Sequence, residues 1–213
     1  DVRIQLFSML KDWRILSLHA LRDLGEFSQN SAVLRKRVLA LEKKKLLKSF
    51  FDPSTRKKYV YLSKHGENAL GIKDYPPALT KRCLLHDAKV SEVAKKFYDL
   101  PELKSMELEH QIFNHKNFKR PKNYIPDFKF LLHREESLET FAGEVEISRK
   151  TKPKIKGKLQ DYLEASIYDR VIYFFARKGV LRLFRTILKE ILKGEECKKS
   201  VFAYHPELLT TET

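Results

Sequence analysis

The sequence predicts a fold of the α+β or α/β class, in which a small helical part precedes a mixed sheet flanked by helices. Three observations support this. Residues 1–75 show helical spacing and one hairpin signal, Tyr75-Pro76-Pro77 interrupts the pattern, and residues 81–208 alternate between helix-like and strand-like stretches. Three strands followed by a helix and a further strand favour a mixed sheet, because a crossover helix joins parallel strands. We therefore expect two domains, residues 1–75 and residues 81–208.

The first part begins with two predicted helices. Trp13–Leu24 places apolar residues on one helical face, and Asn30-Ser31 is a typical start signal for the second helix. In that second helix Leu34, Val38 and Leu41 are spaced i, i+4 and i+7, which predicts a core-facing stripe. Between Phe27 and Ser31 the sequence leaves almost no room for another helix.

A hairpin and a short helix are expected next. The runs LLKSFFD and KKYVYLS flank the turn Asp52–Thr55, a spacing typical of two antiparallel strands. Ser63 then caps a short helix that contains the run KHGENAL. The resulting order of helix, helix, basic hairpin and helix resembles the winged helix-turn-helix family over about a third of the chain, and this resemblance implies DNA binding.

The charge of the chain also favours DNA. The 43 Lys and Arg residues exceed the 28 Asp and Glu residues, for a net charge of +15. Such an excess indicates a polyanionic partner, because Lys and Arg neutralise phosphates. We expect the second helix and the hairpin tip to bind double-stranded DNA through Ser31, Arg35, Lys36, Arg56, Lys57 and Lys58. Lys43–Lys45 are better explained as a solvated helix face, and Arg37 lies next to the core stripe.

The second part is predicted as helix, three strands, helix, strand, helix and strand. The ranges are His86–Leu100, Met106–Phe113, Ile125–His133, Thr140–Ser148, Lys154–Ile167, Asp169–Ala176, Gly179–Leu192 and Val201–Tyr204. The segment Asn114–Asn123 is expected to be a basic loop.

Acidic residues are grouped on two of these strands. Glu144 and Glu146 alternate with Val145 and therefore share one face, while Asp127 follows Pro126 on the neighbouring strand. Clustered carboxylates repel one another, and a hard cation such as Mg²⁺ or Mn²⁺ with oxygen ligands removes that cost. Asp127, Glu144 and Glu146 are therefore candidate metal ligands. Each motif alone is more often a turn or a solvated strand face, and the strand order together with the basic charge favours a site.

The pair Pro126-Asp127, followed by EVE at Glu144–Glu146, resembles the PD-(D/E)XK nuclease superfamily. That resemblance implies a restriction-endonuclease-like sheet and metal-dependent cleavage of phosphodiester bonds, with Asp127 and Glu144 binding metal. Glu146 stands where the family usually has lysine, so it would bind metal or act as a base. Lys150 and Lys158 are the candidates to replace the missing lysine, which makes both of them candidate catalytic residues.

The whole order of winged helix, LLHDAKVSEV, PD, EVEISRKT and KLQDYLEA resembles the replication-relaxation family and the MobC-type plasmid mobilization relaxases. This implies site- and strand-specific nicking at a plasmid transfer origin, in the cytoplasm of a bacterium, with accessory mobilization or coupling proteins as further partners. Lys158 and Tyr162 match the lysine and tyrosine of the family. Two alternatives remain open: a plasmid replication or transcription regulator with an inactive nuclease-like domain, and a restriction or transposon endonuclease that cuts both strands.

Other functional classes find little support in the sequence. Two distant cysteines, Cys83 and Cys197, indicate neither a disulfide framework nor a zinc site. Apolar runs such as Val171–Ala176 are far shorter than the roughly 20 residues of a membrane span, so no membrane contact is expected. His110 and His115 do not make the histidine cluster of tyrosine relaxases, and water-mediated cleavage is favoured over attack by Tyr124 or Tyr162.

Overall fold

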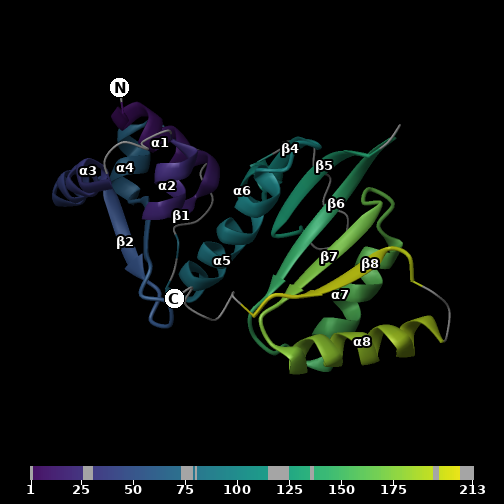
Figure 1. Cartoon of the computed structure of the whole chain (residues 1–213). Helices are drawn as coiled ribbons and strands as arrows, with labels where there is room; N and C mark the ends of the chain where they lie inside the picture. Colours follow the sequence, from purple (N-terminus) through teal and green to yellow (C-terminus); the bar gives the residue numbers. More distant parts are fainter. Residues whose placement is uncertain are drawn as a thin grey trace. The chain divides into compact units, whose positions relative to one another are not determined.

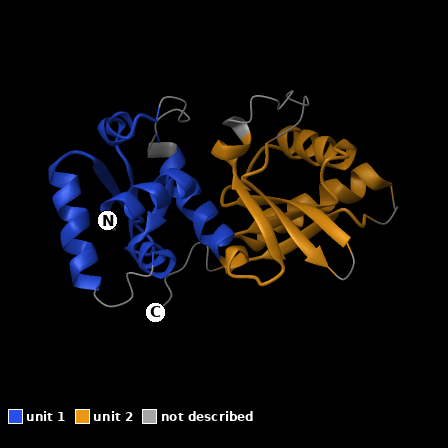
Figure 2. Cartoon of the chain, turned by 90° about the horizontal axis from the view of Figure 1, so that it is seen from above, with its two compact units in different colours: residues 1–95 blue, residues 96–213 orange. Residues whose placement is uncertain are grey.

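The computed structural model describes residues 2–25, 31–72, 79, 81–114, 125–134, 137–193 and 197–206. It divides into two compact units, residues 1–95 and residues 96–213, which are coloured separately in Figure 2. The division lies inside helix α5 (Lys81–Tyr98), further along the chain than Tyr75–Pro77, where the sequence predicts a linker. That predicted linker lies outside the described residues.

Unit 1 combines helices with one small sheet (Figure 1). Its elements before α5 are α1 (Val2–Trp13), β1 (Ile15–Ser17), α2 (Leu18–Leu24), α3 (Ser31–Lys43), β2 (Leu47–Phe51), β3 (Lys58–Leu62) and α4 (Lys64–Ala69). The strands form an antiparallel sheet in the order β1-β3-β2. The expected stripe of Leu34, Val38 and Leu41 is buried in its core, against Leu6 and Leu10 of α1. The predicted hairpin is β2–β3, and Ser63 caps α4 as expected.

The prediction of one helix over Trp13–Leu24 was wrong. Arg14 has a φ of 64°, a left-handed conformation that an α-helix does not accommodate, and α1 ends before it. β1 then pairs with β3, and the Ser17 side chain accepts a hydrogen bond from the backbone N–H of Ala20 at 3.0 Å, which starts α2. A separate short helix, α2, therefore precedes α3, and it lies before the stretch between Phe27 and Ser31, where the sequence leaves almost no room for a helix.

Unit 2 is a five-stranded mixed sheet with helices. Its elements are β4 (Leu103–Leu108), α6 (Glu109–Asn114), β5 (Phe128–Arg134), β6 (Ser137–Glu146), α7 (Lys152–Glu164), β7 (Arg170–Phe175), α8 (Lys178–Leu192) and β8 (Ser200–Tyr204). The order is β4-β5-β6-β7-β8; β4–β5 and β5–β6 are antiparallel, and β6–β7 and β7–β8 are parallel. The expected mixed α and β class is confirmed.

Two details of unit 2 differ from the prediction. The strand expected over Met106–Phe113 ends at Leu108, where α6 begins, and the strand expected to reach Ser148 ends at Glu146. The alternating pattern of MELEHQIF predicted a strand through Phe113, because a short helix such as α6 is too brief to show a helical period in the sequence. Most of the expected basic loop Asn114–Asn123 lies outside the described residues.

The two faces of the sheet are filled differently. On one face, Phe97 at the end of α5 packs against Phe128, Phe130 and Phe174. Gly143 lies opposite Phe128, and a Cβ atom there would lie 2.3 Å from the Phe128 ring, so glycine is needed at this position. On the other face, α7 and α8 cover β6 and β7 (Figure 1), and the glutamates of β6 point to this side. No helix among the described residues is long and apolar enough to cross a membrane.

Candidate active site and nucleic-acid surface

β6 and α7 bring four polar side chains together inside unit 2. Glu144 and Glu146 lie two residues apart and share a strand face, while Lys158 and Tyr162 lie four residues apart and share a helix face. Ile155 and Leu159 pack α7 onto the sheet, which holds that helix face over the glutamates. Glu144, Glu146 and Lys158 are 2%, 1% and 5% exposed. We call Glu144, Glu146, Lys158 and Tyr162 the glutamate centre.

The lysine joins the two carboxylates. Lys158 Nζ donates to Glu144 Oε2 and to Glu146 Oε1, the second contact at 2.7 Å. Tyr162 donates its hydroxyl hydrogen to Glu144 Oε1. Both oxygens of Glu144 therefore have protein donors, and one ammonium group serves two buried carboxylates.

Two further predicted residues lie at the edge of the centre. Asp127, just before β5, accepts a hydrogen bond from the backbone N–H of Val145 at 2.7 Å, which fixes the start of β5 against β6. Lys150 lies beyond the end of β6, yet its Nζ donates to Glu146 Oε1 at 2.9 Å. The structure thus brings Glu144, Glu146, Lys150 and Lys158 into one hydrogen-bonded group and places Asp127 against the same strand.

The electrostatics of the centre favour a protonated carboxyl. Burial, reinforced by the charges of Asp127 and Glu146, raises the pKa of Glu144 to about 7, against the lowering effect of Lys158. Burial opposes the charge of Lys158, but the neighbouring carboxylates outweigh it and raise the Lys158 pKa well above its ordinary value. Burial and the Glu144 charge also raise the pKa of Tyr162, so this tyrosine remains a hydroxyl donor at neutral pH.

Asp127, Glu144 and Glu146 have the donor atoms that a hard divalent cation prefers, but the Lys158 ammonium occupies the place between the two glutamates where such a cation would bind. All three acids offer oxygen, the donor that Mg²⁺ and Mn²⁺ prefer. Within the described ranges, however, no three His, Cys, Asp or Glu side chains converge closely enough to hold a metal ion. The physical reason is that the Lys158 ammonium lies between the two glutamates and Asp127 is turned to the Val145 N–H. Metal binding at Glu144 and Glu146 therefore requires Lys158 to move.

The predicted DNA-binding residues lie on α3 and the β2–β3 hairpin. Ser31, Arg35 and Lys36 are exposed on α3, and Arg56 is exposed at the hairpin turn, where its φ is 53°. Arg35, Arg56 and Lys58 line one hollow between helix and hairpin. This surface brings the predicted cations of both elements together.

Two of the hairpin lysines have protein partners. Lys58 Nζ lies 2.9 Å from Glu42 Oε2 and is 18% exposed, and Lys57 Nζ lies 3.3 Å from Glu92 Oε1 and is 36% exposed. Their charges are partly neutralised inside the protein, so they suit phosphate binding less well than Arg35, Lys36 and Arg56. Two lysines at the end of a hairpin do not indicate, from the sequence alone, that they form ion pairs with acids distant in the chain.

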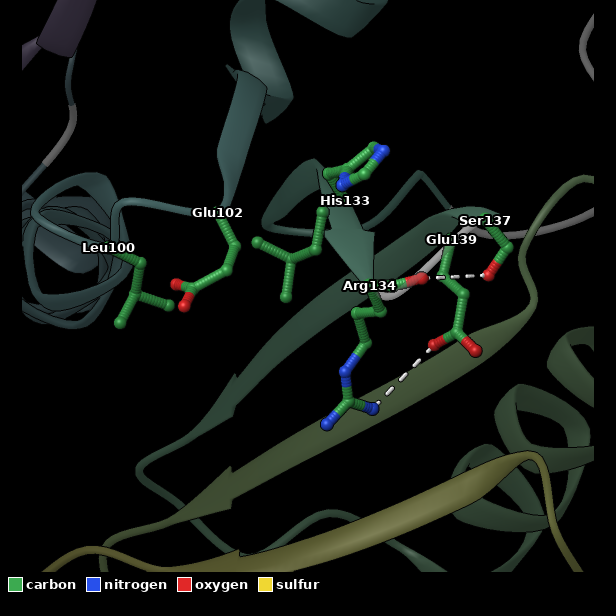
Figure 3. A pocket seen from close by; sticks show the side chains of 7 residues that line it. Leu100, Glu102, His133, Arg134, Ser137 and Glu139 are labelled. Carbon is green, nitrogen blue, oxygen red and sulfur yellow. Dashed lines mark hydrogen bonds and ion pairs between the residues drawn. The ribbon is translucent and has the colours of Figure 1, made fainter.

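Sequence reasoning missed two polar sites. Asp52, interpreted as a turn residue, forms a fully buried ion pair with Lys89 of α5 at 2.9 Å. At the turn end of β5 and β6, a hollow of about 570 Å³ is lined by Leu100, Glu102, Leu132, His133, Arg134, Ser137 and Glu139 (Figure 3). There Glu139 is held between Arg134 at 3.8 Å and Arg170 at 3.4 Å. Glu139 precedes Glu146 by seven residues of one strand, roughly 20 Å, so this hollow is separate from the glutamate centre.

His110 is buried in α6, while His115 and Tyr124 lie outside the described residues.

Comparison of the chain with protein-family models, with curated proteins and with solved structures gives no match.

Proposed function

We propose that the chain is a metal-dependent DNA endonuclease that nicks one strand at a plasmid transfer origin, as a MobC-type mobilization relaxase does. One observation carries the proposal. Glu144 and Glu146 at the end of β6 and Lys158 on the next helix form a buried cluster, with the partly exposed Lys150 bonded to Glu146 and Asp127 bonded to the same strand. Two buried carboxylates on one buried lysine, with the pKa of Glu144 raised to about 7, are typical of functional sites.

The arrangement of both units supports the proposal. The order α1-β1-α2-α3-β2-β3 with the sheet order β1-β3-β2 agrees with the winged-helix resemblance, which sequence reasoning gave in a less complete form. The order α5-β4-α6-β5-β6-α7-β7, with a parallel strand pair after two antiparallel ones, supports the PD-(D/E)XK resemblance, and α6 is an element that the sequence did not predict. A fold alone does not establish an activity, so the proposed nuclease activity is inferred mainly from the buried cluster of Glu144, Glu146 and Lys158.

In this proposal each side chain has a defined task. Glu144 and Glu146 would supply oxygen ligands to Mg²⁺ or Mn²⁺, and Asp127, bonded in this structure to the Val145 N–H, would supply a third. The bound metal would polarise a phosphoryl oxygen and lower the pKa of a bound water. Tyr162 orients Glu144 through its hydroxyl. Lys158, if displaced from the glutamates by the metal, would offer its ammonium to the scissile phosphate. Lys150 remains at the rim, where it binds Glu146 or the phosphate.

A second candidate function is a DNA-binding regulator of plasmid replication or transcription with an inactive nuclease-like domain. The observation that favours it is the saturation of Glu144, whose two oxygens already accept hydrogen bonds from Tyr162 and Lys158. A centre neutralised in this way is stable without metal. The two functions differ in whether Lys158 leaves the carboxylates when metal and DNA are present.

The test is a nicking assay on supercoiled plasmid carrying a candidate transfer origin. We expect Mg²⁺- or Mn²⁺-dependent conversion to open circles, lost in Glu144→Gln and Asp127→Asn, with DNA affinity unchanged or higher. Linear product would favour an endonuclease that cuts both strands. Tight binding without cleavage under any metal would favour the regulator.

The DNA-binding part of the proposal has its own test. Arg35→Ala with Lys36→Ala should weaken binding and reduce the slope of log affinity against log salt by about two, roughly one for each phosphate that is no longer neutralised. Lys43→Ala with Lys44→Ala, on the same helix, is the matched control and should change the slope less. Equal losses of affinity in the two double variants would show that Arg35 and Lys36 contribute no more to DNA binding than the other cations of α3.

A further inference from the structure

The DNA-binding surface also exposes large apolar side chains, for which phosphate binding gives no reason. Phe51, the last residue of β2, is 60% exposed, and Leu39 on α3 is 51% exposed. Both line a hollow of about 330 Å³, and the other residues that line it are Leu18, Arg35, Val38, Arg56 and Lys58. Its volume is near the lower end of the roughly 300–1,000 Å³ typical of small-ligand sites. We call it the Phe51 hollow.

Charge at the rim favours a polyanion over an apolar protein segment. Arg35 of α3 and Arg56 of the turn between β2 and β3 both line the hollow. Both are exposed, and neither has an ion pair with another residue in the described part of the chain. Two cations beside an exposed aromatic ring are the elements by which proteins bind single strands, through phosphate contacts and base stacking.

The ring of Phe51 is held in place from within the protein. Lys58 Nζ lies over the ring, 5.9 Å from its centroid, and is itself fixed by Glu42 at 2.9 Å. Lys58 thus supports the ring, which explains why this lysine is half-buried on a surface predicted to bind phosphate. With 60% of the side chain exposed, the ring still offers a face to a planar ligand.

We propose that the Phe51 hollow binds one unpaired base of a DNA strand, stacked on Phe51 and packed against Leu39, with Arg35 and Arg56 on the flanking phosphates. An unpaired base fits because its face is open, whereas base faces in a duplex are covered by their neighbours. This inference rests on the proposed function and deepens it: it names locally opened DNA, with one strand exposed, as the substrate on which a strand-specific nickase acts.

The test uses a tryptophan reporter and an alanine variant. Trp13 is the only tryptophan in the chain, so Trp13→Phe with Phe51→Trp gives one reporter in the hollow. Titration with a 12-nucleotide single strand should quench its fluorescence, and the matched duplex should not. Phe51→Ala should weaken binding of the single strand about 5- to 150-fold, the range typical for removal of one stacking partner, and leave duplex affinity within about twofold. Ile4→Ala, an exposed apolar residue of α1, is the matched control.

The outcomes separate the inference from the proposed function. Equal weakening of single strand and duplex, or quenching by both, would show an ordinary duplex contact and overturn the inference. Unchanged binding by Phe51→Ala would overturn it as well. Selective loss of single-strand binding would support it even if the wild-type protein nicked no plasmid, in which case only the nuclease proposal fails. Circular dichroism checks that each variant is folded.

Discussion

Among the described residues each unit buries one lysine in contact with acids, and the two ionic centres differ in how deeply those acids are buried. In unit 1, Lys89 Nζ lies 2.9 Å from Asp52 Oδ2, with side chains 1% and 0% exposed. Asp52 also accepts hydrogen bonds from the Ser54 N–H at 2.9 Å and from the Ser54 and Thr55 hydroxyls, both at 2.7 Å. In unit 2, the buried Lys158 serves two buried carboxylates.

The carboxyl pKa values of the two centres move in opposite directions. Burial pushes the pKa of Asp52 upward, but the hydrogen bonds from Lys89, Ser54 and Thr55 outweigh it and hold that pKa well below its ordinary value. Burial and the charges of Asp127 and Glu146 raise the pKa of Glu144 to about 7, against the lowering effect of Lys158. In the first centre Lys89 also lies 3.4 Å from Glu92, which is 20% exposed, so this lysine too contacts two acids, and its pair with Asp52 fixes the hairpin turn to α5. In the second, both acids that contact the lysine are at most 3% exposed, and carboxylate oxygens are the ligands that a hard divalent cation prefers.

The largest expected effects come from replacing each buried lysine by methionine. Lys89→Met leaves the buried Asp52 and the partly exposed Glu92 without this lysine, and Lys158→Met leaves two buried glutamates without theirs. Loss of one partner of a buried pair costs about 3–5 kcal/mol of unfolding free energy. The variants should differ with metal. Mn²⁺ should recover stability in Lys158→Met, because a ligand that binds only the folded state stabilises it, and should not help Lys89→Met.

Urea unfolding with and without Mn²⁺ measures both effects. If Lys158→Met proves too unstable to purify, Lys158→Arg keeps the positive charge and allows Mn²⁺ affinity to be compared with that of the wild type by calorimetry. A failure of Mn²⁺ to stabilise Lys158→Met, or equal stabilisation of both methionine variants, would contradict a metal role for Glu144 and Glu146.

A medium effect is expected from pH, with opposite signs in the two centres. Between the ordinary Glu144 pKa of 4.5 and its raised value of about 7, the folded state keeps a proton that the unfolded state has lost. Stability from Glu144 therefore falls as pH rises through this range. Asp52 has a lowered pKa, so its contribution is lost as pH falls below its ordinary value of 3.8.

Urea midpoints between pH 3 and 8 test these signs. Glu144→Gln should flatten the decline between about pH 4.5 and 7, and Asp52→Asn should flatten the loss on the acid side. The same slope in the wild type and in Glu144→Gln between pH 4.5 and 7 would mean that Glu144 releases its proton normally when folded.

The sequence was informative wherever a signal is local. Alternation around Val145 placed Glu144 and Glu146 on one strand face, and the 3.6-residue period placed α3, α7 and α8. The prediction failed where the backbone conformation of one residue interrupts a helical pattern, as at Arg14, whose left-handed conformation ends α1. It also failed at α6, because six residues with an alternating pattern carry no helical period.

The ionic partners were beyond sequence reasoning. Lys89 follows Asp52 by 37 positions, and nothing in a turn or an amphipathic helix indicates that these two charges meet. Likewise, the lysines at the hairpin tip find Glu92 and Glu42 only after folding. The sequence indicates Lys158 as a substitute for a missing catalytic lysine, but its place between two carboxylates depends on the packing of α7 onto β6. Pairs of charges distant in the chain are fixed by tertiary structure alone.

The smallest effects concern one lysine at the rim of each centre. Lys57 contacts Glu92 at 3.3 Å and is 36% exposed, and Lys150 contacts Glu146 at 2.9 Å and is 37% exposed. Exposed ion pairs contribute about 0–1 kcal/mol, so Lys57→Ala and Lys150→Ala should both unfold at nearly the wild-type urea midpoint. If the glutamate centre is catalytic, Lys150→Ala should slow plasmid nicking by at least tenfold at saturating DNA, and Lys57→Ala should not. The reason is that Lys150 contacts an acid of that centre, whereas Lys57 does not. Equal nicking rates in the two variants would leave Lys158 as the sole lysine of the site, since it is the other one in contact with Glu146.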